Sequence, residues 1–259
     1  MVYDYEYFKK RVYSLTKIDL SAYKEKQMKR RIDTLIERHS FKDYETFLGS
    51  LVTDKDVLDE FVNYLTINVS EFYRNPEQWE ILDKEIIPDL IAKKGRRLKI
   101  WSAACSTGDE PYSLVMALSK HVPLSDITIY ATDIDKQVIA AAKTGVYIDK
   151  SIANVPADLK DKYFIKVGNN SYKIADEIKA RVKFEEHNLL RDAYPENVDL
   201  IVCRNVLIYF TEEAKEEIFK KYFNSLSKGG ILFLGSTEQM MSYKQVGYER
   251  LSSFYFRKP

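Results

Sequence analysis

The sequence predicts an α/β fold with a mainly parallel sheet and a small antiparallel β-insertion, preceded by an all-helical N-terminal region. Two observations carry this prediction. From residue 98 onward, short apolar segments alternate with helical segments, which is typical of a parallel sheet covered by helices. Before residue 68, apolar residues recur only at helical spacing, without the alternation of a strand.

Composition narrows the class of protein. The chain has 259 residues, of which 45% are hydrophobic and 31% charged, so it is a globular protein of one or two domains. The formal net charge of +1 gives no general attraction for nucleic acid. Cys105 and Cys203 are far apart and the three histidines form no cluster, so a metal held by cysteine or histidine is not expected, whereas carboxylate-bound magnesium stays open. With no signal peptide and no uncharged apolar run near ~18 residues, we expect a cytoplasmic protein without membrane insertion.

The first part of the chain is predicted to be helical. Phe8 and Val12 with Leu15, the series from Met28 to Ile36, and the group around Phe61 each follow helical spacing. Residues 1–67 are therefore assigned to a helical N-terminal domain.

Residues 68–97 are expected to form linker helices. Asn75 is predicted to cap a helix, with Pro76 in its first turn and Gln78 bonding back to the cap. Pro88 is predicted to start a second short helix, which Gly95 ends.

The second part, residues 98–259, is expected to hold the sheet. Strands are predicted at 98–103, 127–132, 198–203 and 231–235, with an edge strand at 254–256. Helices are predicted at 110–121, 136–144 and 211–227, the last ended by Gly229 and Gly230. Segments 163–167 and 171–174 flank Gly168, Asn169 and Asn170, which predicts a β-hairpin within an insertion at about 146–184.

A ligand site is expected at the carboxyl ends of the strands. The first strand, turn and helix contain one glycine, Gly108, which alone is a weak nucleotide signal. Asp133 ends the next strand, where a carboxylate suits ribose hydroxyls, although a turn or capping role explains it equally well. Asp109 and Glu110 open the helix after Gly108. They would repel a pyrophosphate and favour a cationic ligand without phosphate, such as S-adenosylmethionine; the alternative is that they only complement the helix dipole.

Four motifs together resemble one family. They occupy residues 66–74, 101–113, 131–135 and 203–210, the last followed by Gly229-Gly230 and by residues 235–238. In order and spacing they are similar to the CheR family, the chemotaxis receptor protein-glutamate methyltransferases, over nearly the whole chain. The departures are conservative: Tyr73 stands where Phe is usual, Ala104 where Gly is common, and Asp109 where Glu is common.

The resemblance implies a Rossmann-like S-adenosylmethionine-dependent methyltransferase sheet, with S-adenosylhomocysteine as product and no metal. It further implies which residues bind the donor. Asn188 and Leu189 would flank the adenine, and Asn205 and Val206 would lie near the reacting end. The whole implied set is Asn68, Ser70, Arg74, Glu110, Asp133, Asn188, Leu189, Asn205 and Val206.

The implied reaction is methyl transfer to glutamate carboxylates of bacterial chemotaxis receptors, which serves sensory adaptation. A glutamate carboxylate is already ionised near neutral pH, so no general base is needed. Arg74 is the candidate to hold one carboxylate oxygen while the other attacks, with Tyr209 as a hydrogen-bonding partner. Both assignments are hypotheses from motif position.

A basic helix face suggests how a partner docks. Lys24, Arg31 and Arg38 recur every seven residues and so lie along one side of the helix, away from Met28, Ile32 and Leu35. Lys26 belongs to the same locally basic segment. By itself such a face indicates a solvated surface or a nucleic-acid contact. The resemblance favours docking on the helical cytoplasmic region of receptors, by a monomer and without nucleic acid. In some family members the β-insertion grips a peptide at a receptor's C-terminus, and nothing in this sequence decides that property.

Two rival functions remain open at this point. One is a methyltransferase for another substrate, and the other is a non-catalytic adaptor that senses S-adenosylmethionine. The presence of Arg74, Glu110, Asp133 and Tyr209 argues for the enzyme.

Overall fold

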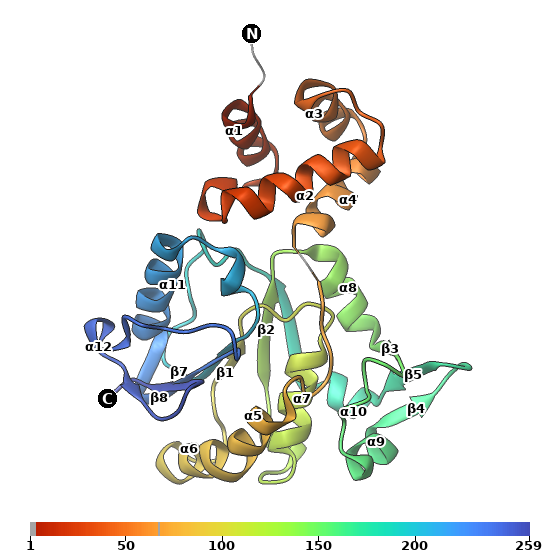
Figure 1. Cartoon of the computed structure of the whole chain (residues 1–259). Helices are drawn as coiled ribbons and strands as arrows, with labels where there is room; N and C mark the ends of the chain where they lie inside the picture. Colours follow the sequence, from red (N-terminus) through yellow and green to blue (C-terminus); the bar gives the residue numbers. More distant parts are fainter. Residues whose placement is uncertain (1–3, 67) are drawn as a thin grey trace. The chain divides into compact units, whose positions relative to one another are not determined.

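A computed structural model describes residues 4–66 and 68–259 of the chain (Figure 1). It divides into two compact units. Unit 1 is the described part of Met1–Ile67 together with Ile208–Glu217, and unit 2 is Asn68–Leu207 with Ile218–Pro259. Ile67, which belongs to the first motif and to the predicted domain boundary, lies outside the described residues, as do the first three residues of the predicted N-terminal domain.

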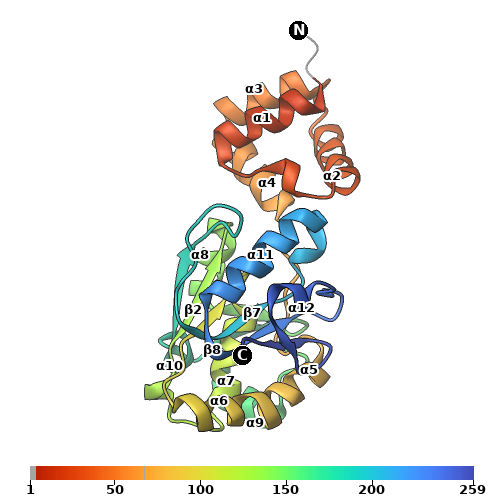
Figure 2. The same ribbon diagram turned by 90° about the vertical axis from the view of Figure 1, so that its left-hand side faces the viewer.

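Unit 1 contains the predicted helices. They are α1 (Tyr5–Thr16), the short η1 (Leu20–Ala22), α2 (Glu25–Arg38), α3 (Tyr44–Thr53) and α4 (Lys55–Leu65) (Figure 2). Acidic caps set their starts, since Asp4 accepts from the Tyr7 N–H and Asp43 forms a capping box with Thr46. Buried rings hold the helices together: Phe8, Phe47 and Phe61 have centroids 5.5–6.2 Å apart. The expectation of an all-helical N-terminal region is confirmed.

Unit 2 is built on a seven-stranded sheet in the order β6-β2-β1-β7-β8-β10-β9. The strands are β1 (Ile100–Ser102), β2 (Ile129–Asp133), β6 (Val182–Glu186), β7 (Val198–Cys203), β8 (Leu226–Leu234), β9 (Glu249–Arg250) and β10 (Tyr255–Arg257). The five strands from β6 to β8 are parallel, whereas β10 and β9 are antiparallel. The strand order reverses direction between β1 and β7, and this is the switch point at which open α/β sheets bind ligands. The predicted α/β class with a mainly parallel sheet is confirmed.

Helices cover both faces of this sheet. On one face lie α5 (Pro76–Ile81), η2 (Leu82–Ile86), α6 (Ile87–Lys94) and α7 (Asp109–Leu118); on the other lies α11 (Glu212–Ser225), whose last residues belong to unit 2. Phe233 of β8 packs edge-on against Trp79 of α5, at 6.1 Å between ring centroids. Trp101 of β1 points the opposite way and packs against Tyr222 of α11, at 5.6 Å. Alternate strand residues therefore pack into two separate cores, one on each face of the sheet. Unit 2 also contains η3 (Leu124–Asp126), α8 (Lys136–Thr144), α10 (Asp176–Lys179) and α12 (Tyr243–Val246).

The predicted insertion is a second, three-stranded antiparallel sheet (Figure 1). Its strands are β3 (Val146–Ile148), β4 (Phe164–Lys166) and β5 (Ser171–Ile174), with α9 (Ala157–Tyr163) leading into β4. The hairpin β4–β5 occurs as predicted, whereas β3 was not expected. The insertion is also shorter than predicted, because Val182 to Phe184 belong to β6 of the main sheet. Only two of the five β6 residues are apolar and half-buried, so the sequence carries no apolar run there.

Two predictions about the C-terminal part of the chain are wrong, one about a strand and one about a helix. The segment around Tyr255 is not an edge strand, because β10 pairs with β8 on one side and β9 on the other. The helix predicted to end at Gly229 and Gly230 ends earlier, at Ser225. The glycine pair instead lies in an irregularity of β8, where the register with β7 jumps from Leu226 to Ile231. Gly229 has φ +76°, a left-handed conformation that favours glycine.

The predicted helix start is confirmed, because α5 begins at Pro76 with Asn75 at its N-cap position. The predicted side-chain bonds are absent: Asn75 adopts a left-handed conformation without a capping hydrogen bond, and the Gln78 side chain does not bond back to it. Nor does Pro88 open a separate helix: α5, the π-helical η2 and α6 follow each other without a break, and Pro88 lies in the first turn of α6. A π-turn is one of the few ways in which a helix absorbs a proline that lacks its N–H group.

Within residues 4–66 and 68–259, no helix is both long and apolar enough to cross a membrane. The same residues contain no group of three or more His, Cys, Asp or Glu side chains placed to hold a metal ion.

Candidate cofactor and active site

The loop between β1 and α7 turns sharply beneath the predicted donor site. Ser106 has φ 45° and Gly108 φ 90°, both left-handed. A Cβ on Gly108 would lie 2.9 Å from the Ala142 Cβ and 3.1 Å from the Tyr147 hydroxyl, so only glycine fits. Tyr147 fixes the loop further by donating to the Thr107 carbonyl at 2.8 Å.

Asp133 ends β2 directly beside this loop. Its two carboxylate oxygens accept the backbone N–H groups of Ser106, at 2.8 Å, and Asp135, at 3.1 Å. Burial raises the pKa of Asp133 to about 6, although these backbone hydrogen bonds favour the charged form. Asp133 therefore ends β2 as expected and has the turn-forming role that was the alternative, while its role toward the ribose stays a prediction.

The two acids at the start of α7 have different surroundings. Asp109 accepts a hydrogen bond from the Thr107 hydroxyl at 2.6 Å, and burial raises its pKa. Glu110 accepts from Ser102 at 2.8 Å and lies 3.8 Å from the guanidinium of Arg204. Burial outweighs both partners and raises the pKa of Glu110 to about 7.

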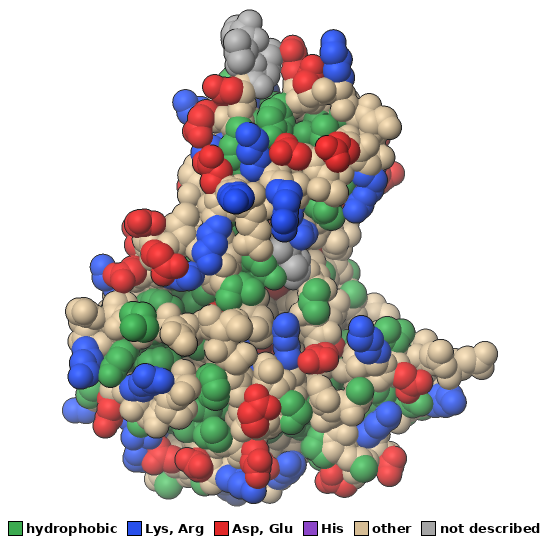
Figure 3. All heavy atoms as spheres, viewed as in Figure 1, with side chains coloured by type: hydrophobic (Ala, Val, Ile, Leu, Met, Phe, Trp, Pro, Cys, Tyr) green, Lys and Arg blue, Asp and Glu red, His purple; other side chains and the backbone are tan. Residues whose placement is uncertain are grey.

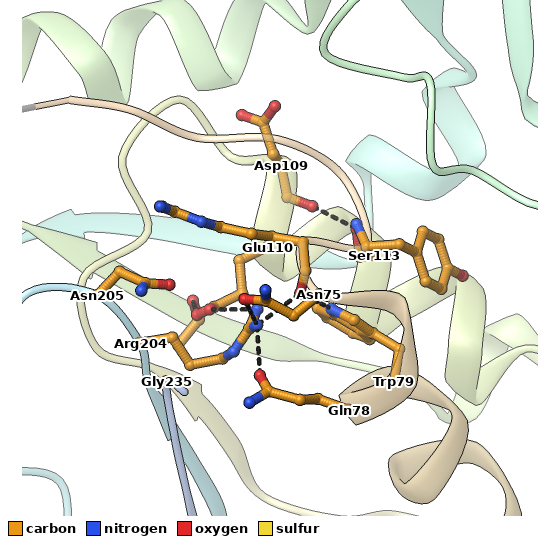
Figure 4. A network of polar contacts seen from close by, with 12 residues as sticks. Asn75, Gln78, Trp79, Asp109, Glu110, Ser113, Arg204, Asn205 and Gly235 are labelled. Carbon is orange, nitrogen blue, oxygen red and sulfur yellow. Dashed lines mark hydrogen bonds and ion pairs between the residues drawn. The ribbon is translucent and has the colours of Figure 1, made fainter. Parts of the chain in front are cut away.

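Arg204, directly after β7, connects this site to the segment before α5. Its guanidinium donates to the backbone carbonyl of Arg74 and, at 2.7 Å, to Gln78 Oε1, and it lies 3.3 Å from Asn75 Oδ1. It also lies over the ring of Phe233, at 4.9 Å from the centroid. Figure 4 shows Asn75, Gln78 and Glu110 around Arg204, while the carboxylate of Asp109 points away. Burial lowers the pKa of Arg204, and the nearby Glu110 opposes that shift.

The segment that precedes α5 carries three predicted donor-binding residues. Asn68 donates its amide to Asp135 at 3.0 Å. Ser70 lies close enough to the Asp109 carboxylate to lower its pKa, which opposes the effect of burial. Arg74 donates from Nη1 to the Val69 carbonyl at 3.0 Å.

The loop after β7 holds Asn205 and Val206. Asn205 has φ 61°, and its N–H donates to the Glu238 carboxylate at 2.7 Å. The Val206 N–H donates to the same carboxylate at 2.8 Å. The loop therefore depends on an acid from another part of the chain.

Asn188 and Leu189 follow β6, at the same edge of the sheet. The backbone N–H of His187 donates to the Asp133 carbonyl at 2.9 Å, which ties this segment to β2. Asn188 is buried, and its side-chain oxygen accepts from the Leu190 N–H at 3.0 Å, so part of its expected capacity for adenine serves the turn. Leu189 is also buried.

The remaining predicted residues belong to unit 1. Tyr209 ends η4 (Leu207–Tyr209), and its backbone carbonyl accepts from the Lys24 N–H at 2.9 Å. Because Tyr209 and Arg74 fall in different units, their predicted pairing stays a prediction.

The four predicted docking residues are not equivalent. Lys24, at the N-cap of α2, and Lys26 are exposed, whereas Arg31 donates to the Tyr64 carbonyl and lies over the Tyr64 ring, at 4.5 Å from the centroid. Arg38 is exposed and forms an ion pair with Glu60 at 3.5 Å. Figure 3 shows basic side chains gathered over α2.

Several buried polar atoms at this edge of the sheet have no partner among the described residues. They are Ser106 Oγ and Asn205 Oδ1, in the loops that follow β1 and β7, and Asp109 Oδ1, at the first residue of α7. Buried polar atoms are nearly always satisfied in a finished protein, so unsatisfied ones grouped at a switch point indicate a ligand. Tyr73, Asn75, Ser106 and Asn205 also have positive φ, and such strain concentrates at functional sites. The chemistry of the site suits a polar ligand that carries positive charge.

Sequence reasoning missed two residues, Arg204 and Glu238. Both lie in the quoted motifs, but neither received a role. The sequence did contain a signal for both residues, because each is a charged residue close to the end of an apolar strand. Charged side chains are rarely buried without a partner, so charges at such positions indicate a specific contact.

Family models match both parts of the chain. The model described as "CheR methyltransferase, SAM binding domain" matches residues 68–254, and "CheR methyltransferase, all-alpha domain" matches residues 3–66.

Similar proteins extend over most of the chain. A "Chemotaxis protein methyltransferase" of Listeria innocua is 39% identical over 255 residues, covering 98% of this chain and 97% of that protein. "Chemotaxis protein methyltransferase 2" of Vibrio cholerae is 35% identical over 223 residues, covering 83% and 77%. "Chemotaxis protein methyltransferase 1" of Pseudomonas aeruginosa is 33% identical over 248 residues, covering 92% and 90%.

A solved structure of a TehB-like SAM-dependent methyltransferase from Corynebacterium glutamicum is similar at 17% identity and a TM-score of 0.40, covering 71% of this chain and 94% of that one. The family assignment does not depend on that likeness, because the two family models and the relatives are sufficient. This chain belongs to the CheR methyltransferase family and is an S-adenosylmethionine-dependent methyltransferase.

Proposed function

We propose that this protein transfers a methyl group from S-adenosylmethionine to glutamate side-chain carboxylates of bacterial chemotaxis receptors, in the cytoplasm. The names of the relatives support the link to chemotaxis. The observation that carries the proposal is that buried polar atoms of Ser106, Asp109 and Asn205 lack a partner among the described residues, at the switch point of the sheet. The family model that matches this part of the chain describes a domain that binds S-adenosylmethionine.

The proposed donor site uses the residues implied by the resemblance. Glu110 would accept the donor's ammonium and Asp133 its ribose hydroxyls. Asn188 and Leu189 would flank the adenine. Asn68 and Ser70 would also contact the donor, and Asn205 and Val206 would lie near its reacting methyl group. When bound, the donor supplies an electrophilic methyl group on a sulfonium.

The role of the protein in the transfer is orientation and charge stabilisation. A glutamate carboxylate has an ordinary pKa of about 4.3, so it arrives ionised and needs no base. Arg74 has five N–H donors in a planar fork, of which one goes to the Val69 carbonyl. We assign Arg74 to hold one carboxylate oxygen of the substrate and Tyr209 to bond the same group. Orientation of this kind contributes up to ~7–11 kcal/mol to lowering a barrier.

Receptor docking is assigned to the basic face of α2. A methylation region rich in glutamate is acidic, and Lys24, Lys26, Arg31 and Arg38 would complement it. The product ester removes one negative charge from the receptor at each turnover, which reduces repulsion between its acidic helices.

The test is transfer of radiolabelled methyl from S-adenosylmethionine to purified receptor cytoplasmic fragments, followed by mild alkali. Label that enters the receptor and leaves as methanol is the expected result. Alkali-stable label would mean that the accepting atom is not a carboxylate oxygen. Binding of the donor without any transfer would favour the adaptor instead.

The catalytic assignments are tested in the same assay. Arg74→Ala and Tyr209→Phe should each lower turnover strongly. Near-normal turnover with intact donor binding in both variants would disprove the two roles.

A further inference from the structure

Glu238, which follows β8, is a buried acid that the proposed mechanism does not use. Its side chain is 5% exposed. Its carboxylate accepts four backbone N–H groups. Oε2 accepts from Asn205 at 2.7 Å and Gly235 at 2.9 Å, and Oε1 accepts from Val206 at 2.8 Å and Leu207 at 2.6 Å.

These four bonds leave the Glu238 carboxylate no capacity for another partner. A carboxylate offers about four lone-pair sites, and here each meets an N–H group. Burial raises the pKa of Glu238, and the four N–H groups oppose that shift by favouring the charged form. Glu238 is therefore placed to join the carboxyl ends of β7 and β8 rather than to exchange a proton with a substrate.

The residue most affected by this connection is Asn205. It has φ 61°, a left-handed conformation that asparagine adopts more readily than most residues but that still costs energy, which its surroundings offset. Its own N–H and those of the next two residues are the groups that Glu238 binds. With the backbone held in this way, Asn205 Oδ1 stays buried without a partner among the residues described.

Gly235 is required by the same arrangement. A Cβ at this position would lie 2.7 Å from Glu238 Oε2, 3.0 Å from the Asn205 backbone nitrogen and 3.2 Å from Asn205 Nδ2. No left-handed φ is involved at Gly235, so the constraint is one of space alone. Any side chain here would push the carboxylate away from the loop.

We propose that Glu238 is a positioning residue for methyl transfer. It holds the Asn205–Val206 loop in the conformation that presents Asn205 to the methyl donor, and it touches neither donor nor receptor. The inference rests on the proposed function, because it takes the ligand of this loop to be S-adenosylmethionine.

The experiment measures binding of S-adenosylhomocysteine to the full-length protein by calorimetry, and methyl transfer to receptor fragments. The variant is Glu238→Gln, which keeps the shape of the side chain. Its amide has a single acceptor oxygen and an NH₂ group that faces N–H donors, so part of the four-bond set is lost. We expect the Kd for S-adenosylhomocysteine to rise by up to roughly tenfold, because losing hydrogen bonds to a charged group lowers the population of the loop conformation that binds. Glu249→Gln is the matched control, since it makes the same charge change at an exposed position on β9.

Gly235→Ala provides a second, independent variant in which the carboxylate is retained. It should raise the same Kd, and combining it with Glu238→Gln should add little, because both changes release the same loop. If either single variant lowers only the melting temperature and keeps the Kd and kcat/KM within twofold of the wild type, Glu238 has a purely structural role and the proposal is overturned. If the wild-type protein itself binds no S-adenosylhomocysteine, the proposed function fails first, so the two failures are distinguishable.

Discussion

At the scale of single residues, the site depends on buried charges that balance each other. Glu110 and Arg204 are both buried, and each is the main opposite charge near the other. A buried pair of this kind is rarely a net source of stability, but removing one partner leaves an uncompensated charge. The sequence indicated Glu110 because this residue lies in the first turn of a helix at the expected ligand site. Its partner Arg204 lies 94 residues (204 − 110) further along the chain, so the pair could not be predicted from local sequence.

Donor affinity should fall as the solution becomes acidic. The pKa of Glu110 is about 7, above its ordinary value of 4.5, so near neutral pH part of the free protein carries a neutral Glu110 that accepts an ammonium less well. If only the ionised form binds, the Kd for the donor rises roughly tenfold per pH unit below about 7. Calorimetry between pH 6 and pH 8, at about half-unit steps, measures this.

The effect of pH on the stability of the fold is opposite in sign to its effect on donor affinity. A folded-state pKa above the ordinary value means that Glu110 contributes most to stability below about pH 4.5, and that this contribution is lost as the pH rises through about 7.

The variant Glu110→Gln tests whether Glu110 causes the pH dependence of donor affinity. It should bind the donor more weakly and lose the pH dependence near pH 7. Unchanged pH dependence in this variant would assign the titration to another group.

Replacing Arg204 by Met should destabilise the fold by about 3–5 kcal/mol, because Glu110 then remains buried without its counter-charge. Urea unfolding measures the change, with Arg191→Met as a control that removes an exposed arginine. Adding Glu110→Gln to Arg204→Met should recover part of the loss. No recovery in the double variant would show that the hydrogen bonds of Arg204 to the segment before α5 matter more than its charge.

At the scale of elements, the donor site is made by loops at the carboxyl ends of parallel strands. Each loop is shaped by a contact from a different element: Tyr147 of β3 holds the Thr107 carbonyl, and Glu238 after β8 holds the Asn205 loop. The positions of β1, β2 and β7 and of the helices α7 and α8 followed from apolar periodicity, whereas β3 and β6 did not. The loop conformations did not, because they depend on partners distant in sequence.

Gly108→Ala tests whether the β1–α7 loop is set by close packing. The new methyl group would meet the Ala142 Cβ at 2.9 Å, and φ 90° is unfavourable for alanine. We expect a loss of stability of about 1–3 kcal/mol and weaker donor binding. Gly49→Ala is the control, because nothing lies within 4 Å of the Cβ added there. Equal donor affinity in the Gly108 and Gly49 variants would contradict the role given to this loop.

At the scale of the whole molecule, the two units have separate proposed tasks, docking for unit 1 and donor binding for unit 2. Segment Ile208–Glu217 belongs to unit 1 although it follows β7 in the chain. Within unit 1, Tyr23 and Phe210 form an isolated bridge and their rings lie 4.8 Å apart. Sequence order alone assigns this segment to the second part of the chain, so its membership of unit 1 was not expected.

The docking role is best tested at Lys24 and Lys26. Arg31 and Arg38 make contacts to Tyr64 and Glu60, so reversing their charge would also disturb the helices of unit 1. Lys24→Glu with Lys26→Glu should raise the KM for receptor fragments several-fold and leave the Kd for the donor unchanged. Lys42→Glu, at an exposed position outside α2, is the control. An equal rise in KM for the control and the double variant would indicate a general charge effect rather than a docking face.

The sequence by itself determined the α/β class, the helical first part, the β4–β5 hairpin and, through its motifs, the family. These features depend on periodicity and on residue types that act locally, so they can be read along the chain. Only the tertiary structure shows that the Asn75 side chain makes no capping bond, that β10 lies inside the sheet, and that Arg204 and Glu238 each contact several segments of the site. The physical reason is that buried charges and strained loops are stabilised by partners far away in sequence, and only folding brings those partners together.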